Sequence, residues 1–255
     1  SHSCGLTVDG TVECWGSDSY GESSPPDTPF QSVSVGRRHT CALTLSGNAV
    51  CWGDNESGQS TPPSTTFTSL NAGESHNCAV TASGLVECWG YNASGQSTPP
   101  EGTFQSVSAG DNHTCGVTTS ASVECWGEPW YWHSSPPSGT VDTVRAGDSH
   151  PRSFTTPSPV QCWGADDAGQ SSPPTLDAQA ITAGFAHSCA LDLEGRAQCW
   201  GGNDDGQAAP PSEVFTAISA GGSHTCGLSS AGAITCWGNN LSGQLDAPDG
   251  VWRQV

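Results

Sequence analysis

The sequence predicts an all-β fold, a seven-bladed β-propeller that spans residues 1–255 as a single domain. Three observations predict it. The tripeptide Cys-Trp-Gly occurs seven times, always at an interval of 37 residues. The residues between these tripeptides form short β-prone runs that are separated by Gly, Asn, Ser and Pro. The two ends of the chain together supply the parts of one repeat, which indicates a ring.

Each repeat is predicted to contain four strands. In the second repeat these strands are residues 30–35, 39–43 and 50–52, followed by a weaker one at 59–61. Four antiparallel strands that repeat radially make a propeller blade. An open solenoid stays as an alternative, but it requires polar capping repeats at its ends, and the sequence shows none.

The terminal segments predict how the ring closes. Residues 251–255 match the beginning of a first strand such as 214–218, whereas residues 1–4 match residues 223–226. One blade would therefore take its first strand from the C-terminus and its other strands from the N-terminus. The chain has 255 residues, four fewer than seven complete repeats, and contains neither Met nor a signal segment. We therefore expect a processed or trimmed chain.

Composition excludes several classes of function. The chain carries a net charge of -19, and its six cationic side chains are all Arg. Nucleic acid is excluded as a partner because phosphate binding needs clustered Lys and Arg. The absence of Lys excludes phosphate-binding P-loops and Schiff-base catalysis. No apolar run approaches the length of a membrane span, so no membrane insertion is expected.

The repeat resembles a known family. Its pattern is Ala-Gly-x-x-His-x-Cys-Ala-Leu followed by Gly-x-Val-x-Cys-Trp-Gly-x-Asn-x-x-Gly-Gln. This pattern resembles the regulator of chromosome condensation repeat in its extracellular version, which has two cysteines per blade. Similar repeats occur in crinkly-type receptor ectodomains, in bacterial secreted or surface proteins, and in propeller-type β-lactamase inhibitors. The resemblance implies a seven-bladed propeller used for binding, and it leaves the ligand open.

The 13 cysteines predict six disulfides. In six repeats two cysteines lie ten residues apart, on consecutive strands that a tight turn joins, where opposed side chains are close enough to bridge. Each bridge closes an 11-residue loop and stabilises the fold by about 2.8 kcal/mol. Arg152 replaces the partner of Cys162, which is expected to keep its thiol. The predicted bridges are Cys4–Cys14, Cys41–Cys51, Cys78–Cys88, Cys115–Cys125, Cys189–Cys199 and Cys226–Cys236.

Disulfides indicate a secreted, extracellular or cell-surface protein. The alternative use of these cysteines, zinc binding together with the neighbouring His, does not fit the spacing of known zinc sites. We therefore expect no metal and no cofactor.

A histidine also recurs in every repeat, as in His76 of Ser75-His76. We interpret these histidines as structural, each donating a ring hydrogen bond to a neighbouring backbone carbonyl. Catalysis is disfavoured because seven equivalent catalysts are implausible and because adjacent strand residues face opposite sides. The chain is therefore predicted not to be an enzyme. The seven periodic Trp are expected to wedge between blades.

Candidate binding residues lie where the blades differ. The Gly-x-x-His turns and the loops after Trp-Gly are predicted to share one face, and blade-specific loops on a rigid scaffold suit recognition. The sharpest difference is residues 128–133, where three consecutive aromatics replace small turn residues and offer binding anchors. An alternative is that this loop packs on its own blade, next to the repeat that lost its Cys. The candidates are Arg37, Arg38, Tyr91, Trp130, Tyr131, Trp132, His133 and Phe185.

Two weaker patterns occur in the same loops. Asn-x-Ser/Thr sequons indicate possible glycosylation, but Asn is also a natural turn residue. Acidic residues at 166–167 and 203–205 suggest Ca²⁺ binding, but they lack the ligand order of known calcium loops, which favours solvated turns. The sequon residues are Asn55, Asn92, Asn112 and Asn240.

Together these observations predict a non-enzymatic secreted or cell-surface binding module, with an extracellular protein partner ahead of a glycan. One alternative is a structural or adhesive building block, a repeated subunit of a surface assembly. Another is an inhibitor similar to the propeller-type β-lactamase inhibitors, although Phe185 is the one aromatic at a Gly-x-x turn. Nuclear exchange-factor activity is disfavoured by the predicted disulfides.

Overall fold

The computed structural model describes residues 1–128, 136, 139–147, 151–154 and 160–255. Within these residues no helix has the length and apolar character needed to cross a membrane. The strands are β1 His2–Thr7, β2 Val12–Gly16, β3 Phe30–Val35, β4 His39–Thr44, β5 Ala49–Gly53, β6 Phe67–Ala72, β7 His76–Thr81, β8 Val86–Gly90, β9 Phe104–Ala109, β10 His113–Thr118, β11 Val123–Gly127, β12 Thr143–Arg145, β13 Arg152–Phe154, β14 Gln161–Cys162, β15 Ala178–Ala183, β16 His187–Asp192, β17 Ala197–Gly201, β18 Ala217–Ala220, β19 His224–Leu228, β20 Ile234–Gly238 and β21 Trp252–Gln254.

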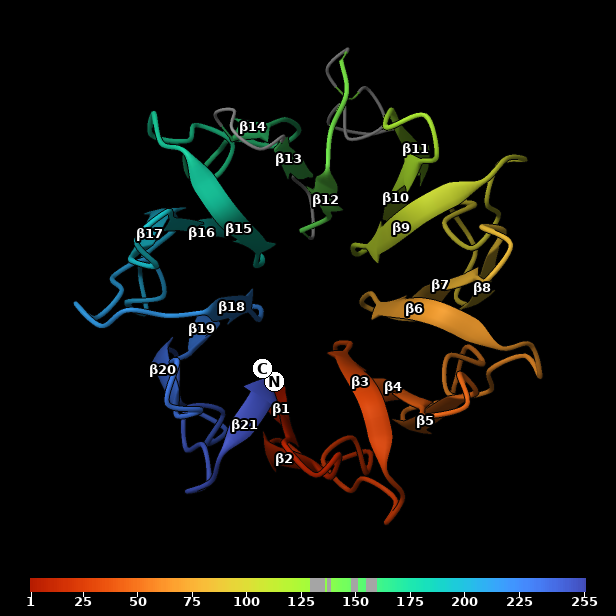
Figure 1. The fold of residues 1–255 in the computed structure, drawn as a ribbon, viewed down its shortest axis with the longest axis horizontal. Coiled ribbons are helices and arrows are strands. Elements are labelled where there is room, and N and C mark those ends of the chain that lie inside the picture. The colour runs from red at the N-terminus through yellow and green to blue at the C-terminus, as the bar shows by residue number, and fades with distance from the viewer. Residues whose placement is uncertain (129–135, 137–138, 148–150, 155–159) are drawn as a thin grey trace.

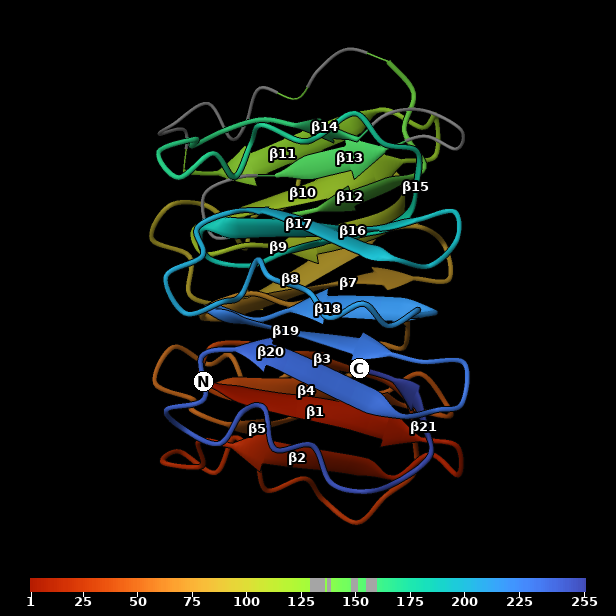
Figure 2. The ribbon, with the colours of Figure 1, turned by 90° about the vertical axis from the view of Figure 1, so that its left-hand side faces the viewer.

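These strands form seven three-stranded antiparallel sheets arranged around a central opening (Figure 1). Six sheets are built from consecutive strands, such as β3-β4-β5, with the first strand nearest the centre and the third at the periphery. Figure 2 shows from the side how neighbouring sheets lie against one another. Because the sheets are arranged radially, the flat faces of adjacent sheets lie against one another.

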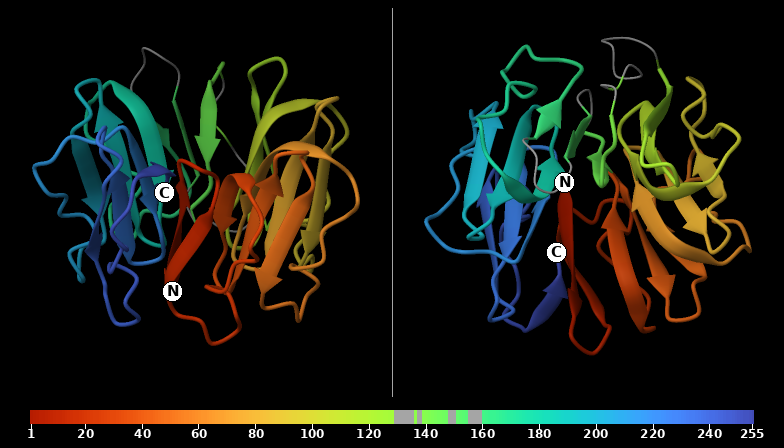
Figure 3. Two further views of the ribbon diagram at one scale, coloured as in Figure 1. Left: turned by 60° about the horizontal axis from the view of Figure 1, so that its bottom comes forward. Right: turned by 45° about the horizontal axis from the view of Figure 1, so that its top comes forward.

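The remaining sheet joins the two ends of the chain, in the order β2-β1-β21. Strand β1 pairs with β21 through Leu6 opposite Gln254 and Thr7 opposite Trp252. Figure 3 shows the N- and C-terminal strands side by side between the first and last complete sheets. The terminal segments therefore lie in one sheet, as their match to the repeat predicts.

The prediction of a fourth strand at residues 59–61 is wrong, because these residues form turns. The backbone N–H of Thr61 donates to Gly58 O at 3.1 Å, and Pro62 follows. The carbonyl of Gln59 accepts the indole N–H of Trp89, which belongs to the next sheet, at 3.0 Å. The backbone groups of this segment are thus used in a turn and a side-chain contact, which leaves them unavailable for a β-ladder.

The core consists of separate apolar clusters, each located between two neighbouring sheets. In one of them Cys41 and Leu43 of β4 pack against Phe67, Ala79 and Trp89 of the following sheet. The prediction that the repeated Trp wedge between blades agrees with this packing. In four sheets the Trp also packs near a Phe of its own sheet; the centroid distances are 6.0 Å for Phe30–Trp52, 5.9 Å for Phe67–Trp89, 5.8 Å for Phe104–Trp126 and 5.7 Å for Phe215–Trp237.

Disulfides connect the second and third strands of six sheets. Cys41 and Cys51 are directly opposed on β4 and β5, with their Cα atoms 4.1 Å apart. Cys162 belongs to none of the six bridges and lies opposite Arg152, across the β13–β14 pair. The six predicted pairings are confirmed: Cys4–Cys14, Cys41–Cys51, Cys78–Cys88, Cys115–Cys125, Cys189–Cys199 and Cys226–Cys236.

The predicted acceptor of the repeated histidines is wrong. In five of the described sheets Nε2 of the ring contacts the side chain that follows the His of the neighbouring sheet, because this short polar side chain points into the space between the sheets. The ring also packs on the glycine of its own turn; a Cβ at Gly36 would lie 2.3 Å from Cε1 of His39. The contacts from Nε2 are His2–Thr40 2.7 Å, His39–Asn77 2.9 Å, His76–Thr114 2.8 Å, His187–Thr225 2.8 Å and His224–Ser3 2.8 Å.

Candidate binding face and central channel

In the complete sheets whose turns the structure describes, two turns lie at the same end, and we call this end of the molecule the loop face. The Gly-x-x-His turn and the loop after Trp-Gly are joined by a backbone hydrogen bond, such as Asp54 N to Arg38 O at 2.8 Å and Tyr91 N to Ser75 O at 2.9 Å. The tight hairpin turns, such as residues 45–48, lie at the opposite end, which we call the hairpin face. The geometry therefore agrees with the predicted common face of the two variable sets.

The loops after Trp-Gly share one internal scaffold. The side-chain oxygen of Asn55 accepts the backbone N–H of Ser60 at 2.9 Å, five residues later. The same bond is made by Asp or Asn at the equivalent position of other repeats. These residues are Asp18, Asn92, Asp166, Asn203 and Asn240. The residues that vary between blades therefore stand on loops of similar backbone shape.

The four sequons differ in their suitability for glycosylation. Asn55, Asn92 and Asn240 are exposed, but their amides hold the loop as Asp18 does in its own repeat. The sequon of Asn112 ends at Thr114, which is fully buried. The turn function of these asparagines explains their occurrence without a glycan.

Two of the candidate residues form contacts on the loop face. Arg37 makes an ion pair with Glu74 of the next sheet, while 65% of its side chain stays exposed. The guanidinium of Arg38 lies 4.9 Å from the centroid of the Tyr20 ring, a cation–π geometry. The structure thus brings Arg38 together with an aromatic residue that sequence reasoning did not select.

Exposed apolar side chains also lie on the loop face. Phe185 is 60% exposed and Tyr91 is 41% exposed, in keeping with their candidate role. Tyr20 and Leu241, at 44% and 92%, were missed. Their signal was available, because Tyr20 and Leu241 occupy the same repeat positions as the candidates Tyr131 and Trp130.

The candidates Trp130, Tyr131, Trp132 and His133 lie outside the described residues. The interval of 37 residues nevertheless identifies the residues at the same repeat positions in the described loops. At the position of Trp130 all six described residues are exposed: Ser19, Glu56, Ala93, Asp167, Asp204 and Leu241. At the position of Trp132 the other six repeats have glycine with φ between 76° and 83°: Gly21, Gly58, Gly95, Gly169, Gly206 and Gly243. Non-glycine residues avoid this backbone conformation, so Trp132 replaces a glycine that the loop shape of the other repeats favours.

The hairpin face carries a feature that sequence reasoning did not consider. Its turns and adjoining residues expose single aliphatic side chains in several sheets. These are Val8, Leu45, Leu85, Leu193, Val214 and Val251. Some of them lie close together, because the backbone N–H of Val8 donates to Val251 O at 3.3 Å and Val214 lies beside the hairpin that carries Leu193.

The repeated histidines have the electrostatics of structural groups. Burial lowers the pKa of His2 and His224 to about 4 and the pKa of His76 to about 3, so these rings are neutral at neutral pH. Nε2 of each of these three rings contacts a neighbouring sheet, and the rings are buried. Within the part of the chain that the structure describes, no group of three or more His, Cys, Asp and Glu side chains could hold a metal ion.

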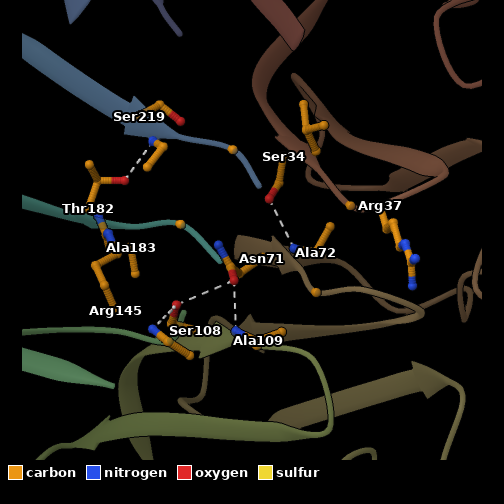
Figure 4. Close-up of a pocket in the computed structure, with 18 of the residues that line it drawn as sticks. Ser34, Arg37, Asn71, Ala72, Ser108, Ala109, Arg145, Thr182, Ala183 and Ser219 are labelled. Atoms are coloured by element: carbon orange, nitrogen blue, oxygen red, sulfur yellow. Dashed lines mark hydrogen bonds between the residues drawn. The ribbon is translucent and has the colours of Figure 1, made fainter. Parts of the chain in front are cut away.

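A channel of about 810 Å³ runs between the innermost strands. Its wall comes from the first strand of each sheet, as Figure 4 shows for Ser34, Asn71 and Ser108. Arg37, Glu74, Asp111 and Phe185 line it at the Gly-x-x turns. Arg145 of β12 also lines it. Sequence reasoning did not single out Arg145, because its neighbours at the same repeat position are small and neutral and only the fold shows that this position faces the channel.

The repeats match a described sequence family. Six segments match the regulator of chromosome condensation (RCC1) repeat, and together they cover more than half of the chain: residues 1–22, 30–59, 67–96, 104–129, 178–207 and 215–244. The chain belongs to the RCC1 repeat family. The repeat that contains Arg152 and most of the aromatic loop falls between the fourth and fifth matched segments, which agrees with its altered sequence.

Solved structures with RCC1-like propellers share this fold. The CRINKLY WD40 ectodomain of the Arabidopsis thaliana receptor kinase ACR4 is 27% identical, with a TM-score of 0.79 over 96% of this chain and 93% of that chain. The ectodomain of the Physcomitrella patens receptor kinase CR4 is also 27% identical, with a TM-score of 0.80 over 93% and 70%. Prp20p of Saccharomyces cerevisiae is 17% identical, with a TM-score of 0.81 over 98% and 86%, and shows the fold alone. A comparison with curated proteins gives no match.

Proposed function

We propose that this RCC1-repeat chain is a closed, seven-bladed propeller that acts as a non-enzymatic extracellular module and binds a protein on its loop face. The seven sheets and the pairing of β1 with β21 support a closed ring. The ring supports the function because it holds all the variable loops on one rigid surface.

The observation that carries the proposal is the exposure of the repeat positions that correspond to the aromatic loop. Leu241 and Tyr20, the described counterparts of Trp130 and Tyr131, are 92% and 44% exposed. Phe185 adds a further exposed ring on the same face. Exposed aromatic side chains together with Arg are the residues that most often anchor protein partners.

Charge favours a protein over a neutral glycan. The chain has a net charge of -19, and its partner gains affinity and association rate from a complementary basic surface. The arginines Arg37 and Arg38 are each held by a neighbour, one by Glu74 and the other by Tyr20. The net negative charge of the chain is then left to be matched by the partner.

An extracellular location is supported by six disulfides, which persist in oxidising compartments. It is also supported by the likeness to two receptor ectodomains. The Prp20p structure is described together with binding to Gsp1p and histones, but its identity of 17% transfers none of this to the present chain.

A second candidate function is a repeated subunit of a surface assembly. The aliphatic side chains exposed on the hairpin face favour it, because they give a second copy or a neighbouring subunit an apolar surface to contact. An inhibitor role is favoured less, since Phe185 is the one aromatic residue among the described Gly-x-x turns.

A capture experiment separates these functions. The immobilised chain is incubated with the surface and secreted fraction of its source, next to a Trp130→Ala, Tyr131→Ala variant and a Leu45→Ala variant. A protein that is retained by wild type and Leu45→Ala but released by the double variant supports the proposal. Retention of further copies of this chain, lost in Leu45→Ala, supports the assembly role instead.

A further inference from the structure

One repeat position contributes a side chain to the wall of the central channel from six sheets. This position is Ser34 in the second repeat, and the residues that share it are Ser34, Asn71, Ser108, Arg145, Thr182 and Ser219. In four sheets its side-chain oxygen accepts a backbone N–H from the inner strand of the next sheet. These bonds are Ala72 N to Ser34 2.9 Å, Ala109 N to Asn71 2.7 Å, Ala146 N to Ser108 3.0 Å and Ala220 N to Thr182 2.8 Å (Figure 4).

The bonds tie the inner edges of neighbouring sheets to one another. An innermost strand pairs with another strand on one side only. The N–H groups on its unpaired edge therefore need other acceptors. A short hydroxyl or amide side chain from the preceding sheet supplies that acceptor. In each bond the donor lies 38 residues after the acceptor. The same separation places the N–H of Ala183 opposite residue 145, and both residues line the channel.

Arg145 cannot supply this acceptor. A guanidinium carries five N–H donors and no acceptor. Arg145 and the N–H of Ala183 are therefore both hydrogen-bond donors in the same part of the channel, and neither can accept from the other. Among the described residues, Arg145 donates one hydrogen bond, from Nη1 to Val144 O at 3.3 Å. The side chain is exposed to the water in the channel, although the walls around it lower the pKa of the guanidinium, which stays protonated at neutral pH.

The other charged side chains that the structure describes in the channel wall lie three residues further along their chain segments, at the Gly-x-x turns. Arg37 and Glu74 neutralise one another in an ion pair. Burial raises the pKa of Asp111, and the charge of Arg37 acts in the opposite direction. At the position shared by Ser34 and Arg145, the described side chains include one cation and no carboxylate.

We propose that Arg145 and the backbone N–H of Ala183 bind a carboxylate group in the central channel. A carboxylate offers two coplanar oxygens that match the guanidinium fork, and one of them replaces the hydroxyl or amide oxygen found at the other seams. A single negative charge suits the site because it contains one cation in a chain of net charge -19, which disfavours phosphate and other multivalent anions. The channel volume is that of a site for a small organic molecule.

The carboxylate has two possible sources: a free small acid, or an acidic side chain of a polypeptide that enters the channel. The test is a titration of the ¹⁵N-labelled chain with propionate and, in parallel, with a short neutral-ended peptide that contains one Glu. The expected result is a saturable shift of the Ala183 amide signal with at least one of the two, while sodium chloride at the same ionic strength gives none. The ligand that binds more tightly identifies the source.

Two variants keep the test independent of folding. Arg145→Ser introduces the residue found at positions 34, 108 and 219, so it should fold normally and bind Ala183 N–H itself, while its affinity for the carboxylate falls at least tenfold. Arg196→Ser removes another cation, one that pairs with Asp192 and Glu194, and should bind like wild type. Equal binding by Arg145→Ser, or no saturable shift in wild type with either probe, would overturn the proposal. Because the site does not involve the loop-face aromatics, this outcome leaves the proposed function untouched.

Discussion

His76 donates a hydrogen bond from Nε2 to Oγ1 of Thr114 on the neighbouring sheet, over 2.8 Å. Thr114 gives its only hydroxyl hydrogen to Gln96 O at 3.1 Å, so it must accept from His76. This fixes the neutral tautomer with the proton on Nε2. Gln96 O also accepts the indole N–H of Trp126 at 2.9 Å. The carbonyl of Gln96 thus contacts Trp126 and Thr114 directly, and Thr114 connects it to His76 of the preceding sheet.

The buried histidines predict that acid destabilises the fold before most carboxylates titrate. Burial lowers the folded-state pKa of His2 and His224 to about 4 and that of His76 to about 3, from 6.5. Below pH 6.5 the unfolded chain therefore binds more protons, and the free energy of unfolding falls as the pH falls toward 4. Asp111, whose pKa is raised by burial, opposes this change as a single group. Melting temperatures at constant ionic strength should decrease steadily from pH 7 to pH 4, and a flat profile would contradict the prediction.

The hydrogen-bond chain through Thr114 predicts a specific loss of stability. Thr114→Val keeps the shape of a fully buried side chain but leaves His76 Nε2–H without its acceptor. An unsatisfied buried donor costs about 1 to 3 kcal/mol. Urea denaturation should show this loss for Thr114→Val and a much smaller one for Thr114→Ser, which retains the hydroxyl. Equal losses for both variants would mean that packing of the methyl group, not the hydrogen bond, matters here.

The repeat without a disulfide predicts an engineered seventh bridge. Residue 152 and Cys162 are directly opposed on β13 and β14, as the bridged cysteines are in the other sheets. Arg152→Cys should therefore form a bridge with Cys162 and raise stability by up to about 2.8 kcal/mol, the value for an 11-residue loop. Alkylation of the unfolded chain without reductant should add one label to wild type and none to the variant. Two labels on the variant would show that the strands do not pair closely enough.

The pairing of the terminal strands predicts that the last residues of the chain hold the sheets together. Trp252 on β21 is 3% exposed and packs against Trp15 and Leu228, which belong to two different sheets. Trp252→Ala should cost about 3 to 5 kcal/mol, as large-to-small core substitutions do. Val251→Ala is the matched control, because that side chain is exposed. A Trp252→Ala variant that melts like wild type would argue for an open array of sheets.

The aromatic loop predicts the position of the partner. Trp130→Ala combined with Trp132→Ala should weaken partner binding by about 2 kcal/mol or more, the usual scale for anchor residues. Leu45→Ala on the hairpin face should leave it unchanged. It is a better control than Asp9→Ala, since the Asp9 carboxylate accepts hydrogen bonds from Thr7 and Thr11 and holds its turn. Normal binding by a double variant that melts early would assign the aromatics to packing.

The parts of this protein that depend on short distances along the chain could be predicted from its sequence. The interval of 37 residues identified the repeat and three of its strands. The interval of ten residues between Cys41 and Cys51 identified the bridge, because a tight turn between two strands brings such residues into register. The two ends of the chain, residues 1–4 and 251–255, match different parts of one repeat, and this match identified the sheet that both termini share.

The tertiary structure alone decided which side chains meet between sheets. His76 reaches Thr114, 38 residues away, and Ser34 reaches Ala72 at the same separation. Such contacts follow from the angle and offset between neighbouring sheets, which no periodicity along one strand encodes. For the same reason the sequence could not show that Arg145 faces a channel. A residue's position in the repeat is local information, but what lies opposite it depends on how the sheets pack around the axis.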